Sequence, residues 1–510
     1  MANGKEQLDA FKFGRRRIVA NLIAPSPTGS DEGAPRPVRT FFASIRIGVV
    51  GVAAMIVLGY IHPSAPSGWQ GGLAEDSTTG AAYVFDKNDG ELHPVLNVTS
   101  AQLLLGKNFT KYDVPDSVIV AQKMGAPYGI LGAPPVVPSA AETDLNSWTM
   151  CQTAKNPTNQ ATPGGQTVLE VGYGQGSMTV VNGANGFIVH DSKGRDYLLY
   201  GNFSYLISPV RGLMGSLDGS GNDETGPVGP WVDDTFLQAF QAGSPITDFP
   251  AVQGLGSAVT VPNQPQNAKV GSFGMFATSN GNSYYIETKA GLAQVTEFVY
   301  YLYASNGALT NAGVSGGFSP ALTQSEITSA VPINEQKNPV DIRNVGATWP
   351  TEQVTTEDLD AIAPNSSVLC VNYDGKFAAD PAGDQVPQLA IWYGSQLPDS
   401  TSGAGVGTAG NQYANVVDVA AGHGALSRDV ANGNSATAGP LYLTVSTGSR
   451  YELMTDAAPA GSTGPGASAQ GQLQYEGIKP EPVPDNWMSL VPAGARLDPS
   501  AAGSPYKTTQ

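Results

Sequence analysis

Two short stretches contain residue types that could carry chemistry. The stretch "GVSGG" at residues 313–317 matches G-x-S-x-G, the pattern in which a turn from strand to helix presents a nucleophilic serine. Its flanks are loop-like, and His423 is the only plausible base downstream. The stretch "DGSGNDE" at residues 218–224 alternates oxygen-bearing side chains that could hold Ca²⁺, but it lacks the full loop spacing and the closing glutamate. We interpret the first as a chance match and the second as a solvated acidic turn.

Phosphate binding of the P-loop type would need a glycine-rich loop that ends in Gly-Lys-Ser/Thr. The pairs Gly106-Lys107 and Gly375-Lys376 lack both the preceding glycine and the following Ser or Thr. The formal net charge of −17 argues against nucleic acid, because phosphate backbones attract basic surfaces. The sequence therefore predicts no catalytic residue, no cofactor, no metal ion and no nucleic-acid partner.

The chain has only two cysteines, Cys151 and Cys370. Two cysteines alone cannot complete a tetrahedral zinc site, and the four histidines are scattered along the chain. In an oxidising compartment the two cysteines are expected to form one disulfide. Two buried free thiols are the alternative.

Residues 41–61, "FFASIRIGVVGVAAMIVLGYI", are predicted to span a membrane once. Twenty-one residues of helix would extend roughly 31 Å, about the thickness of one hydrocarbon core. Residues 1–46 contain eight Lys and Arg against four Asp and Glu, and this excess of positive charge places the amino terminus in the cytoplasm. The alternatives are a cleaved signal peptide, with Gly72-Leu73-Ala74 as a weak cleavage site, and a buried core helix. The long charged region disfavours the first, and the one-sided charge favours the membrane over the second. The remaining residues are then expected outside the inner (cytoplasmic) membrane.

The segment "EQLDAFKFGRRRIVANLI" before this span has the spacing of a helix, with Leu8, Phe11, Ile18 and Leu22 near one face. The residues predicted to contact a cytoplasmic partner or anionic lipid are Phe11, Phe13, Arg15, Arg16 and Arg17. An ordinary cluster of topogenic charges would account for the three arginines equally well.

Four hairpins recur beyond the span, at residues 81–96, 186–200, 274–288 and 439–454. Each has alternating apolar residues on both sides of a glycine-containing turn, and the turn glycines are Gly90, Gly194, Gly281 and Gly448. Short helical stretches are predicted after the hairpins, as in residues 99–106 and 289–304. Residues 399–412 and 456–472 are low-complexity and are expected to form mobile loops.

The tip of the first hairpin, Asp86, Lys87, Asn88 and Asp89, is polar enough to suggest a site. Across the four copies, however, the tip changes from "DKNDG" to "DSKG", "SNG" and "STG", whereas the frame and its glycine persist. A reused active site would keep its functional groups and let the frame vary. We therefore interpret the hairpin as a structural unit.

The cysteines lie between the first and second hairpins and between the third and fourth. If they pair, the two intervening segments form one central domain that is split in sequence. The predicted class is α+β: a cytoplasmic helix, one transmembrane helix, and an elongated β-rich extracytoplasmic region of four repeat modules around that domain. In chain order, the predicted regions are 1–40 (cytoplasmic helix and linker), 41–62 (transmembrane helix), 72–135 (repeat 1), 136–180 (first segment of the central domain), 181–262 (repeat 2), 263–345 (repeat 3), 346–430 (second segment of the central domain) and 431–510 (repeat 4).

The whole layout resembles the EccB family, a core component of the type VII (ESX) secretion machinery of actinobacteria. The stretches that carry the resemblance are residues 7–23, 80–106 and 127–139, "WTMCQT" and "SSVLCVNYDG" around the two cysteines, "GHGALSRDV" at 422–430, and residues 482–502. The combination is specific to the family, although each stretch alone is weak evidence for it. The loop at 399–412 and the acidic excess do not belong to the family pattern.

The resemblance implies a scaffold that is not an enzyme. Family members lie in an inner-membrane complex with EccC, EccD and EccE, and their external domains associate with one another and with the mycosin protease. Because the family also has an ATPase label, nucleotide hydrolysis is one alternative function. A module that binds the cell wall through the repeats is another.

Overall fold

The computed structural model describes most of the chain. The residues described are 4–23, 37–61, 64–155, 164–181, 185–208, 213, 217, 229–314, 316–318, 321–331, 342–356, 367–379, 385–398, 406–407, 412–431, 438–454 and 468–505. They divide into two compact units: Met1–Trp69, Ala74–Ala81 and Tyr112–Lys123 form the first, and Gln70–Leu73, Ala82–Lys111 and Met124–Gln510 form the second.

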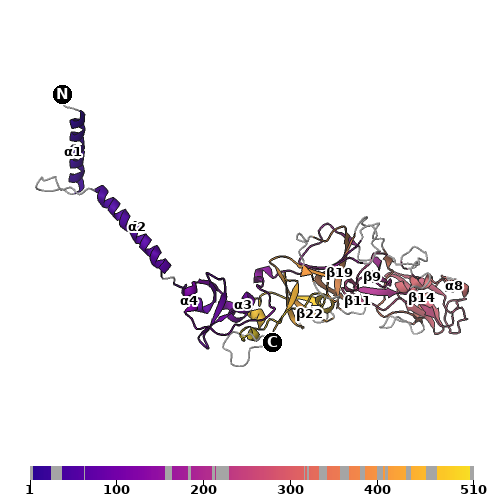
Figure 1. The fold of residues 1–510 in the computed structure, drawn as a ribbon. Coiled ribbons are helices and arrows are strands. Elements are labelled where there is room, and N and C mark those ends of the chain that lie inside the picture. The colour runs from indigo at the N-terminus through magenta and orange to yellow at the C-terminus, as the bar shows by residue number, and fades with distance from the viewer. Residues whose placement is uncertain are drawn as a thin grey trace. The chain divides into compact units, whose positions relative to one another are not determined.

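The first unit contains two long helices, α1 (Gly4–Ile23) and α2 (Pro37–Ile61), which are drawn in indigo in Figure 1. Within α2, Thr40–Val57 is long and apolar enough to cross a membrane and is exposed throughout. The predicted apolar helix is thus confirmed, and it begins at Pro37, where the fixed φ of proline favours a first helical turn. The unit also includes most of β1 (Leu73–Asp76) and β4 (Lys111–Val114), and all of α4 (Asp116–Val120).

All four predicted hairpins form in the second unit. Their strands are β2 (Ala82–Asp86) with β3 (Glu91–Pro94), β8 (Asn185–His190) with β9 (Asp196–Tyr200), β13 (Phe273–Thr278) with β14 (Gly281–Thr288), and β23 (Leu441–Val445) with β24 (Ser449–Leu453). Gly90, Gly194 and Gly448 have φ of 73°, 71° and 71°, and Gly281 has φ of 115°. Side chains with a Cβ avoid this region, so these turns favour glycine.

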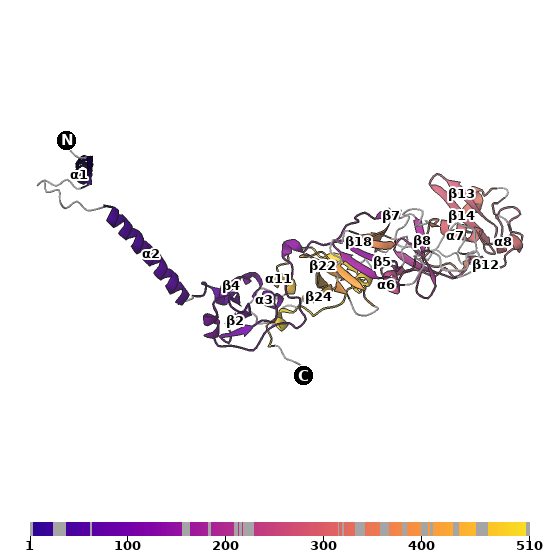
Figure 2. The same cartoon turned by 45° about the horizontal axis from the view of Figure 1, so that its top comes forward.

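A seven-stranded sheet joins the two segments that contain the cysteines, and its order is β20-β21-β6-β5-β18-β19-β7. Its strands are β5 (Trp148–Thr153), β6 (Thr167–Val171), β7 (Thr179–Val181), β18 (Val368–Ala379), β19 (Gln385–Gly394), β20 (Val406–Gly407) and β21 (Val416–Val419). Figure 2 shows β5 beside the orange strand β18, although more than two hundred residues separate them in sequence. Strand β21 pairs parallel to β6, and the other pairs in this sheet are antiparallel.

Three further sheets extend the hairpins. The second hairpin belongs to the order β11-β10-β9-β8-β17, the third to β13-β14-β15 and the fourth to β24-β23-β22-β25. The added strands are β10 (Phe203–Ile207), β11 (Gln241–Ala242), β15 (Gly291–Val295), β17 (Thr355–Thr356), β22 (Gly424–Val430) and β25 (Glu481–Pro484), and the remaining pair is β12 (Ala251–Val252) with β16 (Ile342–Arg343).

Short helices connect these strands. They are η2 (Trp69–Gly71), α3 (Val98–Leu105), η3 (Gly106–Asn108), η4 (Ala140–Glu142), α6 (Asp234–Leu237), α7 (Glu297–Ala304), α8 (Ala308–Asn311), α9 (Gln324–Thr328), α11 (Ala469–Gln472), α12 (Asp485–Met488) and α13 (Pro499–Ala502). The predicted helix after the first hairpin forms because Asn97 caps it, with Oδ1 accepting from the Ser100 N–H at 2.8 Å.

The structure differs from the sequence-based expectation at four places. Residues 291–295 of the predicted helical stretch 289–304 form β15, since they pair with β14, and only α7 is helical. Helix α11 occupies the end of the expected loop 456–472, and strand β20 lies within the expected loop 399–412, where it pairs with β21. Strand β22 falls inside the range predicted for the central domain, but it pairs with β23 and β25 and so joins the sheet of the fourth hairpin.

The largest core among the described residues unites distant segments of the chain. It contains Trp148 and Tyr373 from the seven-stranded sheet, Phe187 from the second hairpin, Phe236 from α6 and Trp487 from α12. Each of these side chains is at most 1% exposed. The mixed class of the chain, an apolar amino-terminal helix followed by a β-rich bulk, is therefore confirmed.

Candidate functional site

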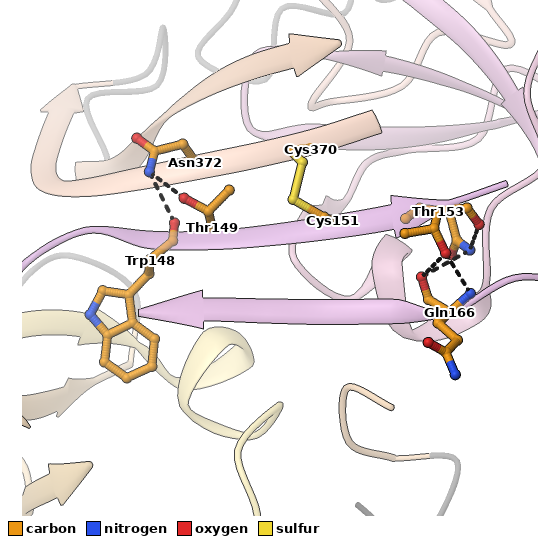
Figure 3. Close-up of a disulfide and its surroundings, with 8 residues drawn as sticks. Trp148, Thr149, Cys151, Thr153, Gln166, Cys370 and Asn372 are labelled. Atoms are coloured by element: carbon orange, nitrogen blue, oxygen red, sulfur yellow. Dashed lines mark hydrogen bonds between the residues drawn. A yellow bond between two sulfur atoms is a disulfide. The ribbon is translucent and has the colours of Figure 1, made fainter. Parts of the chain in front are cut away.

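The disulfide site lies in the middle of the seven-stranded sheet. Strands β5 and β18 run antiparallel, with Cys151 directly opposite Cys370. The structure joins the two by a disulfide, and both residues are 0% exposed (Figure 3). A buried, oxidised pair between neighbouring strands offers no exposed thiol, so this arrangement braces the sheet and does not provide a nucleophile.

Polar contacts hold β5 in register with its two neighbouring strands. Asn372 donates from Nδ2 to Thr149 Oγ1 at 2.8 Å and to the Trp148 carbonyl at 3.3 Å, between the same two strands (Figure 3). Toward the other end of β5, the N–H of Thr153 donates to the Gln166 carbonyl at 2.9 Å, and the N–H of Gln166 donates to Thr153 Oγ1 at 3.0 Å. Since a buried amide without partners is costly, Asn372 disfavours a slipped pairing.

The predicted contact residues of α1 lie on the surface. Phe11 and Phe13 are 69% and 65% exposed, and Arg15, Arg16 and Arg17 are also exposed. The expected apolar face is uncovered as well, with Leu8, Phe11, Ile18 and Leu22 all more than half exposed. The structure does not test what these residues contact, so their role stays a prediction.

The structure describes only some of the stretches considered for chemistry. Ser315 and residues 218–224 fall outside the described residues. His423 lies near the surface, with Nδ1 3.0 Å from Asp144 Oδ1. Gly106 and Lys107 lie in η3 after a helix, and Gly375 and Lys376 lie at an irregularity within β18, where Lys376 pairs with Asp374. Neither Gly-Lys pair links a strand to the start of a helix, as a P-loop does.

One cluster of possible metal ligands was not predicted from the sequence. Asp86, Asp89 and His93 converge in the first hairpin. The spacing D-x₂-D-x₃-H could have drawn attention to it. His93 was missed because it lies in the second strand of the hairpin, and only the turn residues of the four hairpins were compared.

A buried carboxyl in the third hairpin makes stability depend on pH. Glu287 in β14 is 0% exposed, and its two carboxylate oxygens have no hydrogen-bond partner among the described residues. Burial, with a smaller contribution from the nearby negative charge of Glu326, raises the pKa of Glu287 from 4.5 to about 7. The folded protein therefore holds this proton more tightly than the unfolded chain does.

We expect the free energy of unfolding to fall as the pH rises from 4.5 to about 7, by up to ~3 kcal/mol from this group. Glu287→Gln should remove this contribution to the pH dependence, because the amide cannot ionise. Calorimetric unfolding of the full chain in detergent between pH 4.5 and 8 measures the effect. The exposed Glu352→Gln variant is the control, and a Glu287→Gln profile parallel to that of the wild type would contradict the assignment.

Almost the whole chain matches one protein family. Residues 2–508 match the family model described as "Type VII secretion system ESX-1, transport TM domain B". Among the described residues, one helix is apolar and long enough to cross a membrane and a β-rich bulk follows it, in agreement with that description. The chain belongs to the EccB family, as its sequence resemblance indicated.

Named relatives support this assignment. The chain is 26% identical over 507 residues to the "ESX-3 secretion system ATPase EccB3" of Mycobacterium tuberculosis, covering 97% of this chain and 88% of the relative. It is 23% identical over 423 residues to the "ESX-1 secretion system ATPase EccB1" of Mycolicibacterium smegmatis, covering 79% and 78% of the two.

Solved structures share the fold. A chain of the intact ESX-5 inner membrane complex superposes with a TM-score of 0.61 at 18% identity, covering 100% of this chain and 96% of that chain. The EccB3 dimer from the ESX-3 core complex superposes with a TM-score of 0.58 at 23% identity, covering 84% and 99%.

Proposed function

We propose that this protein is a membrane-anchored scaffold subunit of a type VII secretion complex, and that its second unit mediates assembly in the cell envelope. The observation that carries the proposal is the family match over residues 2–508. The fold shared with a chain of the ESX-5 inner membrane complex supports it. The design of the molecule fits the role, since a braced sheet and a shared core hold distant segments in one rigid arrangement.

The proposed orientation places α1 in the cytoplasm and the second unit outside the inner membrane. The excess of Lys and Arg in residues 1–46 supports this orientation through the positive-inside rule. The disulfide agrees with it, because such bonds persist in oxidising compartments.

The proposed partners are EccC, EccD and EccE at the membrane and the mycosin protease outside it. Self-association through the second unit is also proposed, and the dimer formed by EccB3 of the ESX-3 complex supports it. On the cytoplasmic side, the exposed Phe11, Phe13 and Arg15–Arg17 of α1 are the proposed contacts. Apolar rings beside guanidinium groups suit an acidic protein surface or anionic lipid.

Replacing Arg15, Arg16 and Arg17 together by Gln should lower the recovery of EccC and EccD with the tagged chain at least about tenfold. A charge-assisted hydrogen bond contributes ~1.5–3 kcal/mol, and 1.4 kcal/mol corresponds to a factor of ten. Arg36 and Arg39 before the span and Arg46 near its amino end remain, to keep its orientation, and Lys5→Gln with Lys12→Gln is the charge control. Undiminished co-purification, with membrane insertion intact in both variants, would refute the proposed contact.

Hydrolysis of ATP is the second candidate, favoured by the names of the relatives. The two Gly-Lys pairs do not support it, because neither has the P-loop setting. The test is phosphate release by the purified full-length chain. Turnover that a point substitution within the chain abolishes would establish an enzyme and displace the scaffold proposal.

A further inference from the structure

Three potential metal ligands converge in the first hairpin. Asp86 ends β2, Asp89 lies in the turn and His93 lies in β3. One ligand atom from each lies within 4.8 Å of the others. The three belong to one local element, so the hairpin itself holds them in place.

The histidine ring is held in a defined orientation. His93 is 3% exposed, and its ring stacks on Tyr128 with 3.8 Å between centroids. Its Nδ1 lies 2.7 Å from the carbonyl oxygen of Ala126. A carbonyl can only accept, so Nδ1 carries the proton, and in the neutral ring Nε2 is left with a lone pair. Metal-binding histidines are commonly oriented through such a backbone carbonyl.

That lone pair points at another acceptor. Nε2 of His93 lies 3.0 Å from Oδ2 of Asp89. Two acceptors at this distance repel unless a proton or a metal ion lies between them. Zinc binds nitrogen and carboxylate oxygen at about 2.0–2.2 Å, so one ion can bind both atoms at this separation.

Backbone hydrogen bonds also orient the two carboxylates. Oδ1 of Asp86 accepts from the Asn88 N–H at 2.8 Å, and Oδ1 of Asp89 accepts from the Glu91 N–H at 2.9 Å. The turn thus holds one oxygen of each carboxylate. Oδ2 of Asp86 accepts from the Tyr128 hydroxyl at 3.3 Å, beside the stacked His93 ring.

In the second hairpin, a similar carboxylate pairs with an arginine. There the buried Asp191 faces Arg195, with Oδ2 2.6 Å from Nε, so a permanent cation neutralises the turn. In the first hairpin the group facing Asp89 is His93, which carries no such permanent charge. The first hairpin therefore lacks the guanidinium that serves the second.

We propose that Asp86, Asp89 and His93 bind one divalent transition-metal ion, with Zn²⁺ as the probe. An imidazole nitrogen favours zinc over Ca²⁺ or Mg²⁺, which prefer oxygen ligands. The ion ties the turn to β3 and has a structural role in the first hairpin. This inference does not depend on the proposed scaffold function.

The test uses the full-length chain without a histidine tag, stripped with a chelator and dialysed against Zn²⁺. Elemental analysis should find one zinc per chain, and a competing dye gives the affinity. Asp89→Asn should weaken binding at least about tenfold, and His93→Gln should abolish it. Lys87→Gln, in the same turn but without a ligand atom, should bind as the wild type does.

Several outcomes would overturn the proposal. One is that the wild-type chain binds no stoichiometric zinc, and another is that Asp89→Asn binds zinc with unchanged affinity. A third is an imidazolium form of His93 in the untreated chain by NMR, since a proton would then hold the place of the metal. If His93→Gln disturbs folding, Asp89→Asn still decides, because the Asp89 side chain is 41% exposed.

Discussion

Removing the Cys151–Cys370 bond is expected to lower the free energy of unfolding of the second unit by up to about 5 kcal/mol. The bond closes a loop across a sequence separation of 219 residues, and closing so long a loop restricts the unfolded chain strongly. The folded sheet should change little, since β5 and β18 are already paired in register on both sides of the bond. Denaturant unfolding of the full chain in detergent measures the loss.

The single and double alanine variants sharpen this test. Cys151→Ala, Cys370→Ala and the double variant should be destabilised to within about 1 kcal/mol of one another, because each loses the same bond. Losses that add between the two single variants would show that the cysteines act independently. Peptide mapping of the unreduced wild type that recovered both thiols alkylated would also refute the bridge.

Truncating Trp487 is expected to cost about 3–5 kcal/mol, the range for a fully buried tryptophan. Trp487 is 0% exposed, and its ring lies 6.0 Å from that of Tyr373 in β18. Its Nε1 donates to the Ala239 carbonyl at 2.9 Å, so one side chain joins the carboxy-terminal segment, the seven-stranded sheet and the segment after α6. Trp487→Ala should therefore loosen all three together.

Hydrogen exchange would show this coupling, with faster exchange in β18, β25 and residues 236–240 of Trp487→Ala. Trp487→Phe keeps an aromatic ring and loses the hydrogen bond, so it should cost only about 1 kcal/mol. Trp69→Ala, at a half-buried position in the first unit, is the control for loss of a tryptophan. Faster exchange confined to α12 would contradict the proposed role of Trp487.

Several features could be predicted from the sequence because they depend on neighbouring residues. The four hairpins follow from alternating strands on both sides of Gly90, Gly194, Gly281 and Gly448, and all four have positive φ. The apolar helix α2 follows from one uninterrupted hydrophobic run. Residues 291–295 show the limit of this reasoning, since pairing with β14 made a strand of a stretch that looked helical.

Of the two candidate sites, the disulfide was predicted from the sequence and the metal-ligand cluster was not. Two cysteines and a charge pattern were enough to predict a disulfide, while the alternative of free thiols stayed open. The approach of Asp86 and Asp89 to the inner strand residue His93 was not predictable from the turn alone. The orientation of that ring depends on the Ala126 carbonyl and the Tyr128 ring, both more than thirty residues further along the chain.

The sequence by itself determined the four hairpins, the apolar helix and the family, because turn glycines, hydrophobic runs and motif order can be read directly along the chain. Only the tertiary structure decided which strands share a sheet. Strand β21 lies parallel to β6, where Asn415 Oδ1 accepts from the Thr167 N–H at 2.8 Å, and β22 joins the fourth hairpin. Such pairings satisfy buried backbone and side-chain groups across hundreds of residues, and a local pattern does not specify those partners.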